Sequence, residues 1–217
     1  LSGGFGTALI GRHDTPYKLS TNKYNIFADT IADYAATRLD GVGLITGHSR
    51  ASNAIAYISP NMGGLHFAGA VVTSMDQLDA GKTVDAVSLA GGYANGPLTV
   101  DAAWEKISDA VGDDRKAWKL GAGYSFGNAK IGAVYEDVSD DTDRDTVFVV
   151  GSYSMGAIVL KGQYGQVDHG ATDAQAWALG ADYNLSKRTT AFLVYGNGDN
   201  DAGDDVSGWN LGMTHNF

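Results

Sequence analysis

The stretch HDTPYKLSTNKYNIFADTIADYAATRLDGVGLITGHSRA, residues 13–51, is the longest part of the chain without the alternation of a β-strand. It follows a short predicted strand, Phe5 to Arg12, and precedes a long series of strands. Connections of about 40 residues are uncommon in compact domains and are usually functional. We therefore predict that this segment, called the excursion below, folds into a barrel formed by the strands and narrows it.

The rest of the chain alternates with the period of two that half-buried strands show. In the segment Lys116 to Ser125, for example, Trp118 and Leu120 lie on one face and Lys119 on the other. About twelve such segments of about 8–11 residues follow one another, close to the length of a tilted strand that crosses a bilayer. Short turns alternate with longer acidic loops, as expected for the two ends of one barrel.

The predicted fold is therefore all-β: a transmembrane, antiparallel, up-and-down β-barrel, with residues 1–217 as one domain. A soluble β-sandwich would also alternate, but its dry core would favour Ile, Val and Leu. Here the apolar faces carry small residues, with aromatics near strand ends as in an interfacial girdle: Tyr93, Trp104, Trp118, Tyr124, Tyr135, Tyr164, Trp177, Tyr183 and Trp209. The opposite faces, which predict a wet lumen, carry Lys119, Lys130, Glu136, Lys161, Gln163 and Asp182.

The composition excludes several classes of function. The chain contains no cysteine, which rules out thiol catalysis and cysteine-based metal sites. Fifteen Lys and Arg stand against 25 Asp and Glu, a formal net charge of −10, which argues against a nucleic-acid partner. The five His lie far apart, and the chain has no Gly-x-Ser-x-Gly, His-Glu-x-x-His or phosphate-loop motif. We expect neither an enzyme nor a resident cofactor.

Several motifs resemble those of trimeric general porins of Gram-negative outer membranes, most closely the beta-proteobacterial ones. Near the start, Gly3-Gly4-Phe5-Gly6-Thr7, Gly11-Arg12 and Asp14-Thr15-Pro16 are similar to the family's turn, fifth strand and start of the third loop, which forms the constriction. The stretch Ser49 to Asn53 resembles the return from that loop. Tyr183 to Thr189 resembles the last periplasmic turn, and Gly212 to Phe217 the terminal strand with its final Phe.

The resemblance implies a barrel of about 16 strands, of which this chain supplies about twelve. The four N-terminal strands of the family's barrel have no counterpart here. Edges left open in lipid would expose unpaired N–H and C=O groups at a cost of several kcal/mol each. We expect the chain to be the C-terminal part of a longer porin, and a complete but unusually small barrel is the alternative.

The resemblance also suggests which residues line the pore. In the family, basic residues on the barrel wall face acidic residues on the inserted loop, and Arg12 and Arg50 match the wall arginines. Asp29, Asp33 and Asp40 are the candidate loop carboxylates, although no motif fixes which of them face the arginines. The basic loop residues Lys18 and Arg38 are further constriction candidates. The other interpretation of the arginines is structural, since a guanidinium also pins a loop by pairing with its carboxylates or carbonyls.

The implied function is passive diffusion of ions and small hydrophilic solutes through a water-filled channel. The implied location is the outer membrane of a Gram-negative bacterium. The partners would be further copies of the chain in a homotrimer, together with outer-membrane lipid and lipopolysaccharide. The alternative from another class is a plugged barrel that acts in adhesion or binding through its acidic loops.

The acidic loops Asp137 to Asp145 and Gly198 to Asp205 offer the hard oxygen ligands that Ca²⁺ prefers. Neither loop has the spacing of an EF-hand with its terminal Glu. A solvated acidic rim that holds Ca²⁺ only loosely is the other interpretation. The weak candidate ligands are Asp140, Asp141, Asp143, Asp199, Asp201 and Asp204.

Overall fold

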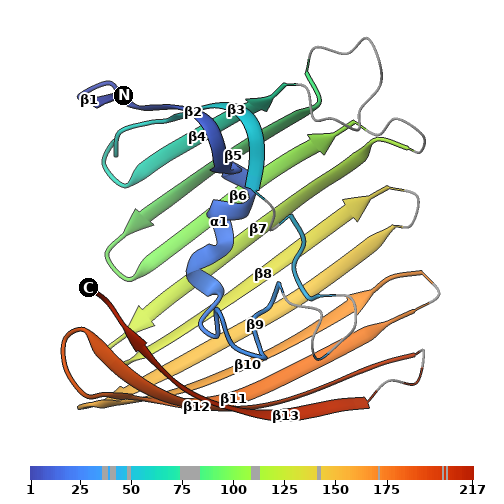
Figure 1. The fold of residues 1–217 in the computed structure, drawn as a ribbon. Helices are drawn as coiled ribbons and strands as arrows, with labels where there is room; N and C mark the ends of the chain where they lie inside the picture. Colours follow the sequence, from blue (N-terminus) through green and yellow to red (C-terminus); the bar gives the residue numbers. More distant parts are fainter. Residues whose placement is uncertain are drawn as a thin grey trace. The chain divides into compact units, whose positions relative to one another are not determined.

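A computed structural model describes residues 1–35, 39, 43–47, 50–73, 84–108, 113–140, 143–170, 172–201, 203 and 205–217. Its strands are hydrogen-bonded in sequence order within one 13-stranded sheet, and the ladders from β1 to β6 and from β10 to β13 are antiparallel (Figure 1). The strands are β1 (Ser2–Gly3), β2 (Gly6–Asp14), β3 (Arg50–Ile58), β4 (Leu65–Val72), β5 (Ala86–Asn95), β6 (Leu98–Ile107), β7 (Arg115–Phe126), β8 (Ala129–Ser139), β9 (Arg144–Met155), β10 (Ile158–Asp168), β11 (Ala174–Asn184), β12 (Thr189–Asn200) and β13 (Asp205–His215).

The up-and-down order confirms the predicted fold class. The described strands number 13, one more than about twelve, because the two-residue β1 pairs with β2 through Ser2↔Thr7 and Gly3↔Gly6. The excursion contains a short helix, α1 (Pro16–Thr21), and a 3₁₀ turn, η1 (Asn22–Tyr24), which the strand pattern did not reveal. No helix among the described residues is long and apolar enough to cross a bilayer.

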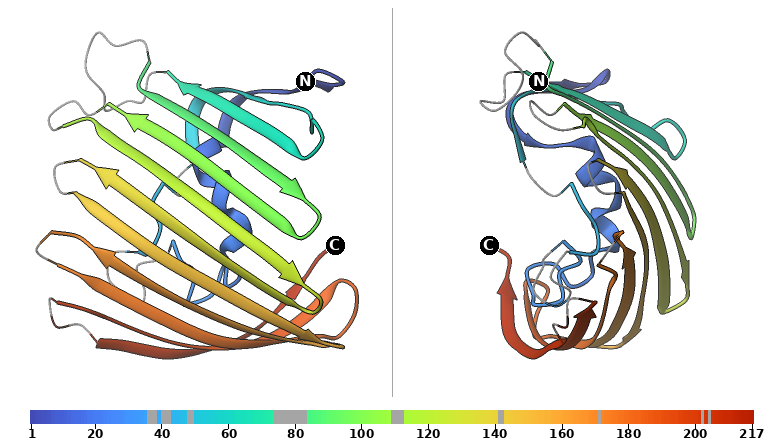
Figure 2. Two further views of the ribbon diagram at one scale, coloured as in Figure 1. Left: turned by 180° about the vertical axis from the view of Figure 1, so that it is seen from behind. Right: turned by 90° about the vertical axis from the view of Figure 1, so that its right-hand side faces the viewer.

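Contacts between residues divide the chain into two compact units. The first unit comprises Leu1–Asn22, Gly47–Ala122 and Tyr135–Asp145. In it, α1 lies on one face of β5 and β6 (Figure 2), and we call the strand face that contacts the excursion the excursion face. A small apolar cluster on this face joins Tyr17 to Ala103, Ala117 and Val138.

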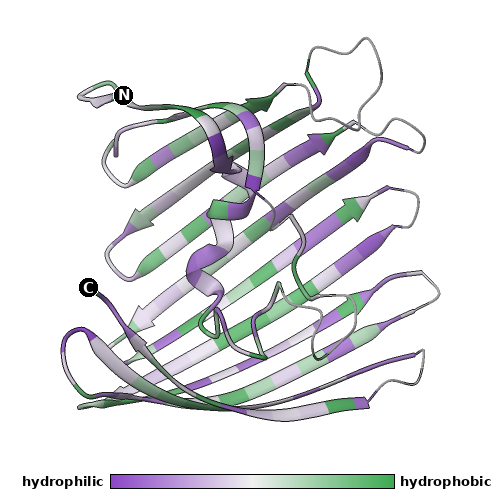
Figure 3. Ribbon diagram, viewed as in Figure 1, coloured by the Kyte–Doolittle hydropathy of each residue, from purple (hydrophilic) through white to green (hydrophobic). Residues whose placement is uncertain are grey.

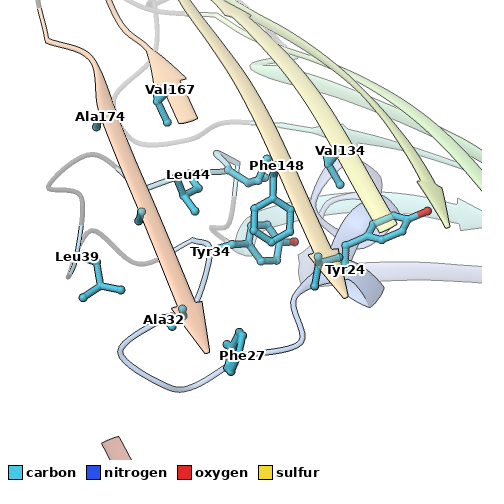
Figure 4. Packing of buried hydrophobic residues seen from close by; sticks show 14 of the residues in the cluster. Tyr24, Phe27, Ala32, Tyr34, Leu39, Leu44, Val134, Phe148, Val167 and Ala174 are labelled. Atoms are coloured by element: carbon cyan, nitrogen blue, oxygen red, sulfur yellow. The ribbon is translucent and has the colours of Figure 1, made fainter. Parts of the chain in front are cut away.

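The second unit comprises Lys23–Thr46, Gly123–Val134 and Thr146–Phe217. The middle of the excursion packs there on the excursion face of the strands and forms the larger apolar core. Figure 4 shows Tyr34 beside Phe148 of β9, with ring centroids 5.4 Å apart, and Leu44 between Tyr34 and Val167 of β10. Burying this apolar surface, at about 25 cal/mol per Å² of accessible area, holds the segment against the strands.

The strand face opposite the excursion, called the outer face below, carries the aromatics of the predicted girdle. Figure 3 shows the alternation of polar and apolar residues along the strands. In the first unit Trp118 and Tyr135 are in ring contact at 5.3 Å. In the second unit a row of rings crosses three strands, from Trp177 to Tyr195 at 5.6 Å and from Tyr195 to Trp209 at 4.7 Å. Large exposed apolar side chains on one sheet face are what a lipid-facing surface requires.

Two of the described turns contain glycine in the left-handed backbone conformation that tight hairpin turns require. Gly96 between β5 and β6, and Gly127 between β7 and β8, have φ values of +57° and +58°. This left-handed conformation is nearly free of cost for glycine and strained for other residues. The long loops at the other strand ends lie partly outside the described residues.

Candidate functional site

The excursion begins with a capped helix. Thr15 is the N-cap of α1, and its Oγ1 accepts a hydrogen bond from the Lys18 main-chain N at 3.2 Å. Pro16 occupies the first helical position, where its missing N–H would be unpaired in any case. The Lys18 ammonium closes the turn with an ion pair of 2.7 Å to Asp14 at the end of β2. This local structure sets the direction of the next side chain, Tyr17.

Tyr17 is completely buried against the excursion face of the first unit. Its hydroxyl donates to Oε1 of Glu136 on β8 at 2.6 Å, and its main-chain N donates to Oγ of Ser88 on β5 at 2.9 Å. The Nζ of Lys119 on β7 lies 4.0 Å from the centroid of its ring. Three strands therefore contact one residue, which fixes the start of the excursion to the sheet.

The surroundings of Tyr17 are charged but closed to water. Glu105, Lys119 and Glu136 are each at most 3% exposed. Arg115 pairs with Glu105, with 3.4 Å between Nη1 and Oε1. Burial, and next the Glu136 carboxylate, raise the pKa of the Tyr17 hydroxyl far above its usual range, so this hydroxyl remains a hydrogen-bond donor. Charges buried in this way are costly unless they are paired, so the cluster depends on each of its members.

The return of the excursion passes close to one edge of the Tyr17 ring. Gly47 has a φ of +75°, and a Cβ placed on it would lie 2.7 Å from Cδ1 of the Tyr17 ring and 3.6 Å from Oε1 of Glu105. Only glycine combines that backbone conformation with so close an approach. Lys119 therefore lies over the Tyr17 ring, and Gly47 lies beside its Cδ1–Cε1 edge.

In the second unit two alternate residues of β10 hold main-chain carbonyls of the excursion. Lys161 Nζ donates to the Ile26 carbonyl at 2.9 Å, and Gln163 Nε2 donates to the Ala32 carbonyl at 2.6 Å. Lys161 also lies 4.9 Å from the ring centroid of Phe27 and 2.9 Å from Oδ1 of Asp182 on β11. These two bonds to the sheet add to the short-range main-chain hydrogen bonds that the segment makes within itself.

The predicted constriction residues are only partly brought together. Arg12 on β2 and Arg50 on β3 are both exposed, and Arg50 Nη2 donates to the Arg12 carbonyl at 3.1 Å. Asp29 is exposed with a φ of +63°. Asp33 organises the excursion itself: its carboxylate accepts from the main-chain N of Asp29 and Ala35 and from Nδ2 of Asn25. Arg38 and Asp40 lie outside the described residues. That Arg12 and Arg50 face carboxylates of the excursion stays a prediction.

The predicted wet lumen is wrong in one respect. Lys119, Glu136 and Gln163 do lie on the excursion face, but each is at most 7% exposed because the excursion covers them. Alternation identified the face, whereas the contact partners could not be found from sequence. The sequence Thr15-Pro16 could have indicated the start of α1, but nothing in the sequence indicated that Tyr17 would be buried.

The acidic-loop candidates do not form a metal site in the part of the chain that the structure describes, where no group of three or more His, Asp or Glu is arranged to hold an ion. Asp143 accepts from Ser139 Oγ at 3.0 Å, and Asp199 accepts from Gln175 Nε2 at 3.3 Å. Asp140 and Asp201 are also described. Asp141 and Asp204 lie outside the described residues.

Comparison with known proteins identifies relatives over the whole chain. The family model described as Gram-negative porin matches residues 1–216. Outer membrane porin protein 32 of Delftia acidovorans is 31% identical over 216 residues, which cover 91% of this chain and 60% of that protein. The chain therefore spans about three fifths of the length of this curated relative.

Solved structures show the same fold. An anion-selective porin from Comamonas acidovorans superposes with a TM-score of 0.82 at 24% identity, over 100% of this chain and 76% of that one. OmpT of Vibrio cholerae, an outer-membrane protein, superposes with a TM-score of 0.71 at 16% identity, over 98% of this chain and 77% of that one. The sheet described above is thus similar to a large part of a porin barrel.

Proposed function

Because this chain belongs to the Gram-negative porin family, whose members reside in the outer membrane, we propose that the protein forms a water-filled channel for passive diffusion of ions and small hydrophilic solutes. The observation that carries the proposal is the position of the excursion. It lies on the polar strand face, where the Tyr17 cluster and the β10 contacts hold it. A segment fixed on that face of a barrel would narrow the lumen without closing it to small solutes.

The proposed channel needs no catalytic residue. Selectivity in such a pore comes from its width and from the field of the charges that line it. The exposed guanidinium groups of Arg12 and Arg50 supply positive charge at the start and return of the excursion, and Asp29 is an exposed carboxylate within it. We propose that these groups, with Asp40, Lys18 and Arg38, set the field at the constriction. Asp33 contributes mainly by shaping the turn that carries Asp29.

We further propose that the protein works as a homotrimer in contact with outer-membrane lipid. The outer face supports contact with lipid, because it presents aromatic and aliphatic side chains that water would not favour. A trimer form is described for OmpT of Vibrio cholerae. Ile10 on β2, 87% exposed, would find an apolar neighbour in lipid or in another copy of the chain.

The experiment that tests the function is single-channel recording of the natural, full-length protein in a planar bilayer, with its intact mass measured on the same sample. We expect large conductance steps that close in thirds, from a protomer heavier than the 22.7 kDa of this chain. A silent membrane, with the protein shown to be folded and inserted, would contradict the proposal. That outcome would favour a plugged barrel that acts through its acidic loops.

A further inference from the structure

Two lysines on the excursion faces of the strands are enclosed by the excursion instead of facing water. Lys119 on β7 is 1% exposed, and the side chain of Lys161 on β10 is 12% exposed. A lysine on the polar face of a channel strand would ordinarily be counted among the charges that attract anions. Their contacts indicate a different role for both.

The ammonium group of Lys119 lies against the face of the Tyr17 ring. Its Nζ lies 4.0 Å from the Tyr17 centroid and has no hydrogen-bond partner among the described residues. A desolvated ammonium so close to an aromatic face is held by the ring quadrupole. The same Tyr17 donates to Glu136, and Glu136 and Glu105 lie within electrostatic reach of the ammonium. Arg115 adds a second positive charge, so the formal charges of Lys119, Arg115, Glu105 and Glu136 cancel within the cluster.

Lys161 repeats this arrangement in the other unit. Its Nζ lies 4.9 Å from the Phe27 centroid, donates to the Ile26 carbonyl at 2.9 Å and lies 2.9 Å from Asp182. Ring and carbonyl belong to consecutive residues of the excursion, so one ammonium fixes both the side chain and the main chain there. Its charge is also balanced, by a carboxylate of the neighbouring strand.

We infer that Lys119 and Lys161 are positioning residues of the channel: each fixes part of the excursion through an aromatic ring, and neither steers ions. The inference rests on the proposed channel function. It follows from charge balance and position together. A lysine charge that is balanced nearby and covered by the excursion contributes little to the electric field that a permeating ion experiences. Removing the ammonium group leaves the aromatic ring of the excursion without its contact.

The experiment compares three lysine-to-methionine variants of the full-length protein in planar bilayers. Lys119→Met and Lys161→Met keep the length of the stem and remove the charge. Lys130→Met is the matched control, because Lys130 lies on the same face of β8 as Glu136 and is exposed. The reversal potential in a salt gradient measures ion preference, and the frequency of brief closures measures how firmly the excursion is held.

We expect Lys119→Met and Lys161→Met to raise the closure frequency by roughly tenfold, because each removes one desolvated cation–π contact. Both variants should leave the reversal potential near the wild-type value. Lys130→Met should shift the reversal potential towards cation preference and leave closures unchanged. Lys119→Arg and Lys161→Arg should restore wild-type closures, since guanidinium also binds ring faces. The inference would be overturned if Lys119→Met or Lys161→Met shifted the reversal potential as much as Lys130→Met does and left the closure frequency unchanged.

A spectroscopic measurement keeps the test decisive if a methionine variant conducts poorly. Residues 1–217 contain no cysteine, so Asn22→Cys and Ala28→Cys, both at exposed excursion positions, each introduce one labelling site within them. We expect Lys119→Met to increase label mobility at position 22 and Lys161→Met to increase it at position 28. Unchanged mobility at both positions would refute the inference. Loss of conductance in the wild-type protein would refute only the proposed function.

Discussion

Glu136 shows how the fold uses a charge that a porin wall would ordinarily present to water. It is completely buried, and the Tyr17 hydroxyl donates to it at 2.6 Å. An ionised carboxylate in such a place is tolerated only with hydrogen bonds and opposite charge around it, and the structure provides both through Tyr17 and Lys119. At the scale of single residues, the excursion is therefore held by polar contacts that water cannot easily replace.

Replacing Tyr17 by Phe removes the hydroxyl but keeps the ring over Lys119. The Glu136 carboxylate then loses a donor in a site closed to water, so we expect a loss of about 1–3 kcal/mol in the free energy of unfolding. Urea unfolding in lipid vesicles, followed by tryptophan fluorescence, measures this loss. Tyr124→Phe is the control, because Tyr124 is 46% exposed on the outer face. Equal effects of the two changes would mean that the buried hydrogen bond contributes nothing.

Replacing Arg50 by Gln tests the proposed field at the constriction. The change removes one exposed positive charge at the return of the excursion and keeps a hydrogen-bond donor for the Arg12 carbonyl. We expect the cation-to-anion permeability ratio to rise by about two- to fivefold, the effect of one charge at pore distances in water. Reversal potentials in a salt gradient report it. Arg188→Gln, in the turn before β12, is the control, and an unchanged ratio for Arg50→Gln would leave the arginine with a structural role alone.

At the scale of elements, the excursion combines short-range hydrogen bonds of its own, such as Thr30 N to the Phe27 carbonyl, with a few long-range ones to the sheet. Its helix α1 has only six residues, far below the length at which an isolated helix is stable. The strands supply what the segment lacks: Ser88 accepts from the main-chain N of Tyr17, and Lys161 and Gln163 bind two carbonyls.

Replacing Gly47 by Ala distinguishes backbone strain from the contact with Tyr17. Gly47 and Gly127 both have positive φ, so alanine costs about 1 kcal/mol at either position. At Gly47 the new Cβ would also lie 2.7 Å from the Tyr17 ring, whereas nothing lies within 4 Å at Gly127. We expect Gly47→Ala to be less stable than Gly127→Ala by about 1–3 kcal/mol in urea unfolding. Equal losses would show that the ring moves away freely.

At the scale of the whole molecule, the two faces of the strands carry different kinds of side chain and have different surroundings. The outer face carries the exposed rings that we propose to meet lipid, and the excursion face carries the charges and the covering segment. All four tryptophans of the chain, Trp104, Trp118, Trp177 and Trp209, are between 37% and 69% exposed. A soluble sandwich would bury such side chains between its sheets.

The tryptophans therefore test the orientation of the whole sheet. In vesicles that contain brominated phospholipids we expect strong quenching of tryptophan fluorescence, because the rings contact acyl chains near the interface. Aqueous iodide should quench the same emission only weakly. The same protein in unbrominated vesicles is the control. Efficient iodide quenching with no effect of bromine would contradict the assignment of the outer face to lipid.

Much of the strand architecture was predictable. Alternation located the strands, and eight of the nine predicted girdle aromatics are among the exposed side chains, with Tyr93 half-buried. The motifs at Gly11-Arg12 and Ser49-Arg50 predicted an excursion over residues 13–51, and the structure has β2 ending at Asp14 and β3 beginning at Arg50. What could not be predicted was the set of contacts along the excursion, because a segment without periodicity gives no signal for the partners of its side chains.

The sequence by itself therefore determined which residues form strands, which strand face is apolar and where the chain leaves the sheet. These properties follow from local alternation and turn chemistry, which act over a few residues. Only the tertiary structure decided that Lys119, Glu136 and Gln163 are covered, because burial of a polar side chain depends on a distant segment that folds over it. Tyr17 meets Glu136 across 119 positions of the chain, a separation at which no pattern of neighbouring residues carries information.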